Sequence, residues 1–136
     1  MLCVPGSLYH SGSHERLLNG QQTGENCGYA WSSGGSQADP RWPVDAWYSE
    51  IKDYNFGYPG FSGQTGISTH GSLIIVSILS TFGGSLGHFT QVVWKESVEL
   101  GFGYAQSSNG AWFYCCNYFP AGNMQGNFPP NVVPKT

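Results

Sequence analysis

Charged side chains are scarce in this chain of 136 residues. They make up 10% of it, against about 25% in an average soluble domain. The five Lys and Arg residues are scattered and the net charge is −3. No basic patch is expected, so nucleic acid is an unlikely class of partner and we expect none. So low a charge is more typical of a secreted or lumenal protein than of a cytosolic one.

Targeting signals and long apolar runs are also lacking. The opening stretch MLCVPGSLYHS has neither the basic start nor the apolar length of a signal peptide. The longest apolar stretch, Ser72 to Leu79, is far shorter than the ~20 residues of a membrane helix. Taken literally, the sequence predicts one soluble, untargeted domain, or a chain that lacks its proper beginning.

Common catalytic motifs are missing as well. HExxH, GxSxG and a phosphate-binding glycine loop are all absent. Two of the four histidines, together with carboxylates, would suit a divalent metal such as zinc. The alternative is a histidine that is buried in the core with its ring nitrogens hydrogen-bonded and that binds no metal. Spacing alone does not say which histidines converge; they are His10, His14, His70 and His88.

The four cysteines leave two alternatives open. Their spacing fits no zinc-finger pattern, and Cys115 and Cys116 point to opposite faces if they lie on a strand. Each of these two would then need a different partner. The cysteines could form one or two disulfides in an oxidising compartment, or all four could be buried free thiols. They are Cys3, Cys27, Cys115 and Cys116.

Periodicity predicts a mixed α/β chain. An apolar stripe at helical spacing predicts a helix over 42–54, with Glu50 at the border between its buried and solvent faces. A short helix is expected after Gly87. Alternating and aromatic runs predict strands over 99–106 and 111–119, joined by a turn at 107–110. The tail from Pro120 is expected to be extended over the surface.

Four segments resemble the CAP superfamily, which includes cysteine-rich secretory proteins, antigen 5 and plant pathogenesis-related proteins. They are GHFTQVVWKES (87–97), FYCCNYFPAGNM (113–124), GENCGYAW (24–31) and WYSEIKDYNF (47–56). The resemblance covers roughly residues 8–66 and 87–136. It implies an α/β fold, an α-β-α sandwich of the CAP (SCP) type, as a single domain over 8–136.

The resemblance also implies a cleft with two histidines and two acidic residues. Matched motif by motif, these are His10, Glu25, Glu50 and His88, with His14 as the competitor for the first position. A divalent cation of the zinc type is the implied cofactor, with His88 as one ligand. Thr90 and Gln91 of the same motif are expected to be structural.

Two departures from the family pattern stand out. Only nine residues precede His10, so the first helix of the sandwich is expected to be largely missing. Residues 67–86 interrupt a run that is continuous in the family and carry no charge. They are either a gene-model artefact, such as a retained intron, or a genuine lid or lipid-contacting loop. No role is expected for His70 within them.

The resemblance favours a non-enzymatic protein that binds a sterol or other lipid, in defence or extracellular signalling. A metal-assisted or general-base hydrolase is the alternative, in which Ser11 or Ser49 is the conceivable nucleophile. A second alternative is a membrane-peripheral protein of the Golgi-associated type. Secretion is accordingly the expected localisation, and peripheral membrane contact is possible.

Overall fold

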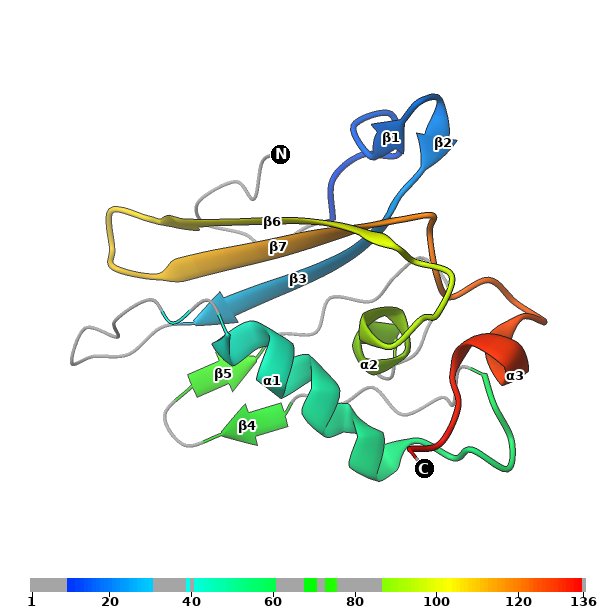
Figure 1. The fold of residues 1–136 in the computed structure, drawn as a ribbon. Helices are drawn as coiled ribbons and strands as arrows, with labels where there is room; N and C mark the ends of the chain where they lie inside the picture. Colours follow the sequence, from blue (N-terminus) through cyan, green and yellow to red (C-terminus); the bar gives the residue numbers. More distant parts are fainter. Residues whose placement is uncertain are drawn as a thin grey trace.

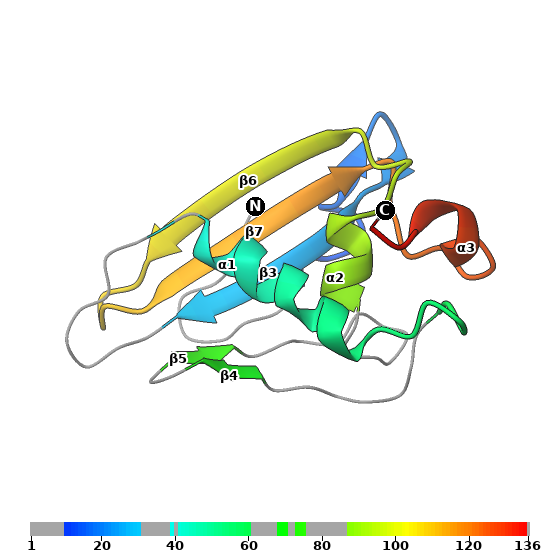
Figure 2. The same cartoon turned by 60° about the horizontal axis from the view of Figure 1, so that its bottom comes forward.

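A computed structural model describes residues 10–30, 39, 41–60, 68–70, 73–75 and 87–135. A three-stranded antiparallel sheet carries helices on one of its faces (Figures 1 and 2). The elements in chain order are β1 (Leu17–Leu18), β2 (Gln21–Gln22), β3 (Gly24–Ala30), α1 (Trp42–Tyr48), the 3₁₀ helix η1 (Ser49–Asp53), β4 (Ser68–His70), β5 (Leu73–Ile75), α2 (Gly87–Val92), β6 (Glu99–Gln106), β7 (Trp112–Phe119) and α3 (Phe128–Asn131).

The sheet has the strand order β3-β7-β6. Both strands predicted from the aromatic runs are confirmed, as β6 and β7, and the turn between them contains Gly110 at φ 85°. Only glycine adopts such a positive φ without strain. The central strand β7 is buried on both faces over most of its length, whereas β6 is a largely exposed edge strand.

Helices α1 and α2 cover one face of the sheet. Trp47 of α1 is fully buried against Cys116 and Tyr118 of β7. The predicted helix over 42–54 forms, but its second half tightens into η1. Tyr48, the last residue of α1, is 40% exposed, and its ring meets Phe89 edge-on.

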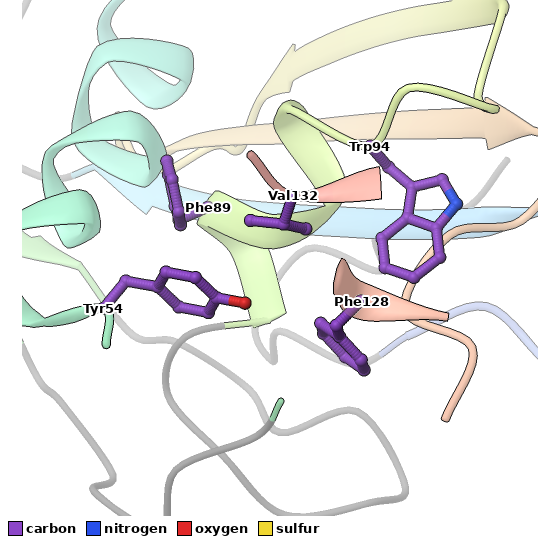
Figure 3. Close-up of a cluster of buried hydrophobic side chains, with 5 residues drawn as sticks. All are labelled: Tyr54, Phe89, Trp94, Phe128 and Val132. Atoms are coloured by element: carbon purple, nitrogen blue, oxygen red, sulfur yellow. The ribbon is translucent and has the colours of Figure 1, made fainter. Parts of the chain in front are cut away.

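The C-terminal tail enters the core, so the prediction that it lies extended over the surface is wrong. Its short helix α3 places Phe128 and Val132, each 3% exposed, in an apolar cluster with Phe89 (Figure 3). Phe128 packs edge-on against Trp94. The two apolar side chains of the tail thus complete the cluster around Phe89.

The opposite face of the sheet carries the β1–β2 hairpin and the segment that leads into it (Figure 1). A second helical layer is not present among the described residues. Of the predicted insertion at 67–86, the described part is the antiparallel hairpin of β4 and β5; whether 67–86 is an artefact or a lid is not tested. In the part of the chain that the structure describes, no helix is long and apolar enough to cross a membrane.

Candidate functional site

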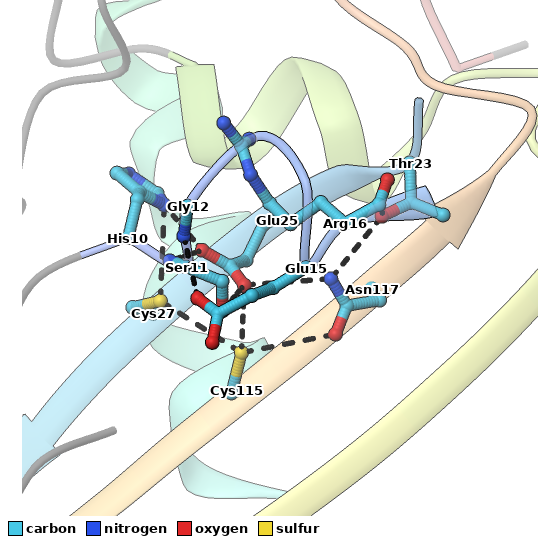
Figure 4. A network of polar contacts seen from close by, with 10 residues as sticks. All are labelled: His10, Ser11, Gly12, Glu15, Arg16, Thr23, Glu25, Cys27, Cys115 and Asn117. Atoms are coloured by element: carbon cyan, nitrogen blue, oxygen red, sulfur yellow. Dashed lines mark hydrogen bonds and ion pairs between the residues drawn. The ribbon is translucent and has the colours of Figure 1, made fainter. Parts of the chain in front are cut away.

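The first of two histidine–glutamate pairs joins the N-terminal segment to β3. His10 Nδ1 lies 2.8 Å from Glu25 Oε1, and the Glu25 side chain is fully buried. Ser11 adds two hydrogen bonds to the same carboxylate, from its backbone nitrogen at 2.8 Å and from its hydroxyl at 2.7 Å (Figure 4). Of the two candidates for this position, the structure places His10 at the carboxylate and leaves His14 exposed.

These contacts determine the protonation of the pair. Burial by itself raises the pKa of Glu25, but the hydrogen bonds from His10 and Ser11 outweigh it and lower the pKa from 4.5 to about 2. Glu25 is therefore ionised at neutral pH and only accepts hydrogen bonds. His10 Nδ1 is therefore the donor in the hydrogen bond to Glu25 Oε1.

The second pair lies under the helices. His88 Nδ1, at the start of α2, is 3.1 Å from Glu50 Oε1 of η1, and Phe89 N donates to the other carboxylate oxygen at 3.1 Å. Both side chains are largely buried, at 7% and 12% exposed. The His88 ring stacks on Trp47 with the two ring planes 19° apart. Glu50 therefore lies at the edge of the buried face, as its helical position predicted.

The two pairs lie on different sides of β3. Glu25 and Asn26 are consecutive, so their side chains point to opposite faces of the strand. Asn26 Nδ2 donates to the His88 carbonyl at 3.1 Å, which places α2 on its side, whereas Glu25 points away. The structure thus brings the four predicted residues together as two pairs rather than as one cluster. Metal binding by the four residues stays a prediction.

Two cysteines that the sequence analysis did not assign to the site lie beside the first pair. Among the described residues, the metal-type donors within 4.8 Å of one another belong to His10, Glu25 and Cys27. Cys115 Sγ lies 3.8 Å from Cys27 Sγ and 3.5 Å from Glu25 Oε2. Cys27 follows Glu25 by two residues on a strand, and this spacing alone would have predicted that their side chains share one face of the sheet. Cys115 joins the cluster only through strand register.

The structure bears on the choice between disulfides and free thiols that the sequence left open. Cys27, Cys115 and Cys116 are buried and form no disulfide among the described residues, while Cys3 lies outside the described residues. Cys115 and Cys116 do point to opposite faces, because Cys115 faces Cys27 and Cys116 packs against Trp47. Burial raises the pKa of the Cys116 thiol from 9.0 to about 11, although a hydrogen bond with Tyr118 opposes the shift.

Thr90 and Gln91 have the structural roles expected of them. Thr90 Oγ1 donates to Asn123 Oδ1 at 2.6 Å, and Asn123 Nδ2 donates to the Gly87 carbonyl at 2.8 Å. Gln91 Oε1 accepts from the backbone of Gly122 at 3.0 Å. These bonds attach the start of α2 to the loop after β7 and so hold the His88 segment in place.

A pocket lies between the β1–β2 hairpin and the end of the sheet. Leu18, Leu100 and Phe119 contribute apolar surface to it, and Arg16 and Glu99 contribute charge. It shares Asn117 with the surroundings of Glu25, because Asn117 Nδ2 lies 3.4 Å from Glu25 Oε2. An apolar ligand with one polar end would match this lining.

Comparison with known proteins places these features in a family context. The family model described as CAP, the cysteine-rich secretory protein family, matches residues 7–118. Golgi-associated plant pathogenesis-related protein 1 of Homo sapiens is 39% identical over 115 residues, which cover 83% of this chain and 58% of that protein. Protein PRY2 of Saccharomyces cerevisiae is 37% identical over 131 residues, covering 95% of this chain and 29% of that protein.

Pathogenesis-related leaf protein 4 of Solanum lycopersicum is 35% identical over 123 residues, 90% of this chain and 57% of that protein. The chain therefore spans between 29% and 58% of the length of these relatives. Among solved structures, BmVAL-1 matches with a TM-score of 0.54 and 23% identity, over 85% of this chain and 50% of that one. This last likeness concerns the fold.

Proposed function

The chain belongs to the CAP family of cysteine-rich secretory proteins, and we propose that it is a non-enzymatic binding protein for a divalent cation and an apolar ligand. Its α/β fold is of the CAP type, in line with the likeness to BmVAL-1. The observation that carries the proposal is the presence of two buried histidine–glutamate pairs, His10–Glu25 and His88–Glu50.

The donor chemistry fits a cation of the zinc type. In each pair a carboxylate oxygen meets Nδ1 of the histidine, which is the arrangement that orients an imidazole for metal binding through Nε2. Neutral imidazole and carboxylate are both good zinc ligands. In the proposal each pair offers its own cation one histidine nitrogen, Nε2 of His10 on one side of β3 and Nε2 of His88 on the other, and Glu25 and Glu50 fix the tautomers of the two rings. A bound cation would supply a fixed positive charge near the ligand.

Thermal melts with and without excess Zn²⁺ test the cation. We expect the melting temperature to rise with zinc, because a ligand that binds only the folded state stabilises it by mass action. The rise should shrink in His88→Ala and in His10→Ala. His14→Ala, at an exposed position, is the matched control and should keep it. A melting temperature that does not change when zinc is added would refute the cation proposal.

The pocket at the end of the sheet supports an apolar ligand, a sterol or another lipid. Leu17 and Leu18 are 48% and 37% exposed there, so they offer apolar surface that a ligand in the pocket would cover. Organic extraction of the purified protein followed by mass spectrometry should release a bound lipid. Leu18→Asp should abolish this binding, whereas Val133→Asp, 50% exposed outside the pocket, should not.

A hydrolase is the weaker candidate. A general base works best with a pKa near the operating pH, but the pKa of Glu25 is about 2. Ser11 donates its hydroxyl proton to this weakly basic carboxylate, which does little to make it a nucleophile. Peptidase activity that disappears in His88→Ala would reverse this assignment.

The proposed setting is extracellular, in defence or signalling. The names of the relatives point two ways, to pathogenesis-related proteins and to a Golgi-associated protein. Peripheral membrane contact belongs to the second of these. Fractionation of cells that express the full-length protein would decide between them, since secretion places it in the medium and Golgi association places it with membranes.

A further inference from the structure

Two thiols, an imidazole and a carboxylate meet on the face of the sheet opposite α2 (Figure 4). Cys27 and Cys115 are direct partners in the register of β3 and β7, and their sulfurs are 3.8 Å apart. His10 Nδ1 is 3.8 Å from Cys27 Sγ, and Glu25 Oε2 is 3.5 Å from Cys115 Sγ. All three strand residues are buried, and His10 covers them from the N-terminal segment.

Three of these spacings come close to the edges of a zinc tetrahedron, whereas Cys115 lies outside the group whose donor atoms all stand within 4.8 Å of one another, which is His10, Glu25 and Cys27. Zinc–sulfur bonds of about 2.3 Å place two sulfurs about 3.8 Å apart, and zinc–nitrogen or zinc–oxygen bonds of about 2.0–2.1 Å place those atoms about 3.6 Å from a sulfur. Two observed edges agree closely and the third, at Cys27 and His10, is about 0.2 Å long. The His10–Glu25 edge of 2.8 Å is a hydrogen bond and would widen by about 0.6 Å to reach zinc geometry.

We propose that Cys27, Cys115, His10 and Glu25 form a thiolate-rich site for a soft divalent cation of the zinc class. Two thiol protons leave to the solvent on binding, and the imidazole proton moves from Nδ1 to Nε2 so that Nδ1 coordinates. Cys115 has to move toward the other three donors to complete four ligands, and a site closed in this way is the pattern of a structural metal rather than a catalytic one. The site fastens the N-terminal segment to β3 and β7.

This site is an alternative to the cation at His10 in the proposed function, because a ring that coordinates through Nδ1 carries its proton on Nε2. The proposed function also uses Nε2 of His88, whereas the thiolate site needs neither His88 nor Glu50. The two proposals share His10 and Glu25, yet sulfur ligation distinguishes them. A disulfide between Cys27 and Cys115 is the competing fate of the same pair of sulfurs.

Cobalt substitution tests sulfur ligation directly. Co²⁺ added to the reduced chain should give a thiolate-to-cobalt charge-transfer band in the near ultraviolet, and Zn²⁺ should abolish it. The band should disappear in the double variant Cys27→Ser/Cys115→Ser. Cys116→Ser is the matched control, because Cys116 is equally buried on the other face of the sheet, and it should keep the band. His88→Ala should keep the band as well.

A second measurement needs no variant and is therefore unaffected by misfolding. Zinc X-ray absorption of the folded wild-type chain should show two sulfur neighbours at about 2.3 Å. Nitrogen and oxygen neighbours alone would overturn the thiolate site while supporting the histidine cation site. A folded, reduced chain that takes up no zinc would overturn both. A Cys27–Cys115 disulfide that persists under reductant, detected by peptide mapping, would overturn the thiolate site alone.

Discussion

The acid stability of the protein should depend on Glu25, because its pKa is about 2 in the folded chain and its ordinary value is 4.5. As the pH falls, the unfolded chain takes up a proton at this position first. The stabilisation is therefore fully present above pH 5 and is lost as the pH falls to about 2. A difference of about 2.5 pH units, at about 1.36 kcal/mol each, amounts to about 3.4 kcal/mol.

The segment that covers the carboxylate lies near the surface, where solvent screens the ion pair. We therefore expect Glu25 to contribute about 2–3 kcal/mol to the free energy of unfolding. Glu25→Gln keeps the size of the side chain and removes the charge that His10 and Ser11 contact. The free energy of unfolding at pH 7 should fall by this amount. Between pH 5 and pH 2 the variant should lose correspondingly less stability than the wild type.

Urea denaturation at a series of pH values between 7 and 2 measures both effects, as shifts of the midpoint at a constant slope. Glu96→Gln, which neutralises an exposed carboxylate, is the control for a general change of net charge. If the wild type and Glu25→Gln lost stability in parallel below pH 5, the folded chain would not depend on this ion pair.

Three further predictions concern packing and thiol chemistry. In Gly122→Ala the new methyl group would lie 2.6 Å from Gln91 Nε2 and 2.8 Å from Trp94 Cγ. Because both side chains are buried, we expect the free energy of unfolding, measured by urea denaturation, to fall by about 1–3 kcal/mol. A variant as stable as the wild type would contradict this packing. Phe89→Ala should lower the free energy of unfolding by about 3–5 kcal/mol, since Phe89 is 1% exposed at the centre of its cluster. A smaller decrease would mean that neighbouring side chains fill the cavity. Cys116 should resist iodoacetamide at pH 8 in the native chain, since burial raises its pKa to about 11; labelling at the rate of the unfolded chain would disprove its burial.

Several local features were predictable because they depend on near neighbours in the chain. The alternation and aromatic content of 99–106 and 111–119 predicted two strands, and the Gly at 110 predicted their turn. The apolar stripe of 42–54 predicted a helix and placed Glu50 at its border, where Glu50 now meets His88. Periodicity did not show that the α-helix ends at Tyr48 and continues as the 3₁₀ helix η1, because an apolar stripe looks much the same in both over five residues.

The pairing of site residues was only partly predictable. The motifs named His10, Glu25, Glu50 and His88, but a motif carries no information on which histidine meets which carboxylate. That followed from β3, whose alternation turns Glu25 away from the face that α2 occupies. The C-terminal tail was misjudged for a similar reason, because its apolar side chains gain their burial from α2 and not from their own sequence neighbours.

The sequence by itself determined the family, the two strands of the β6–β7 hairpin and the residue types available for chemistry, because these are carried by short-range patterns. The tertiary structure alone decided that Cys115 lies opposite Cys27 and beside Glu25. Residues 90 positions apart become neighbours only through the register of two strands, and a shift of that register by one residue would turn Cys115 to the other face and replace it by a neighbour.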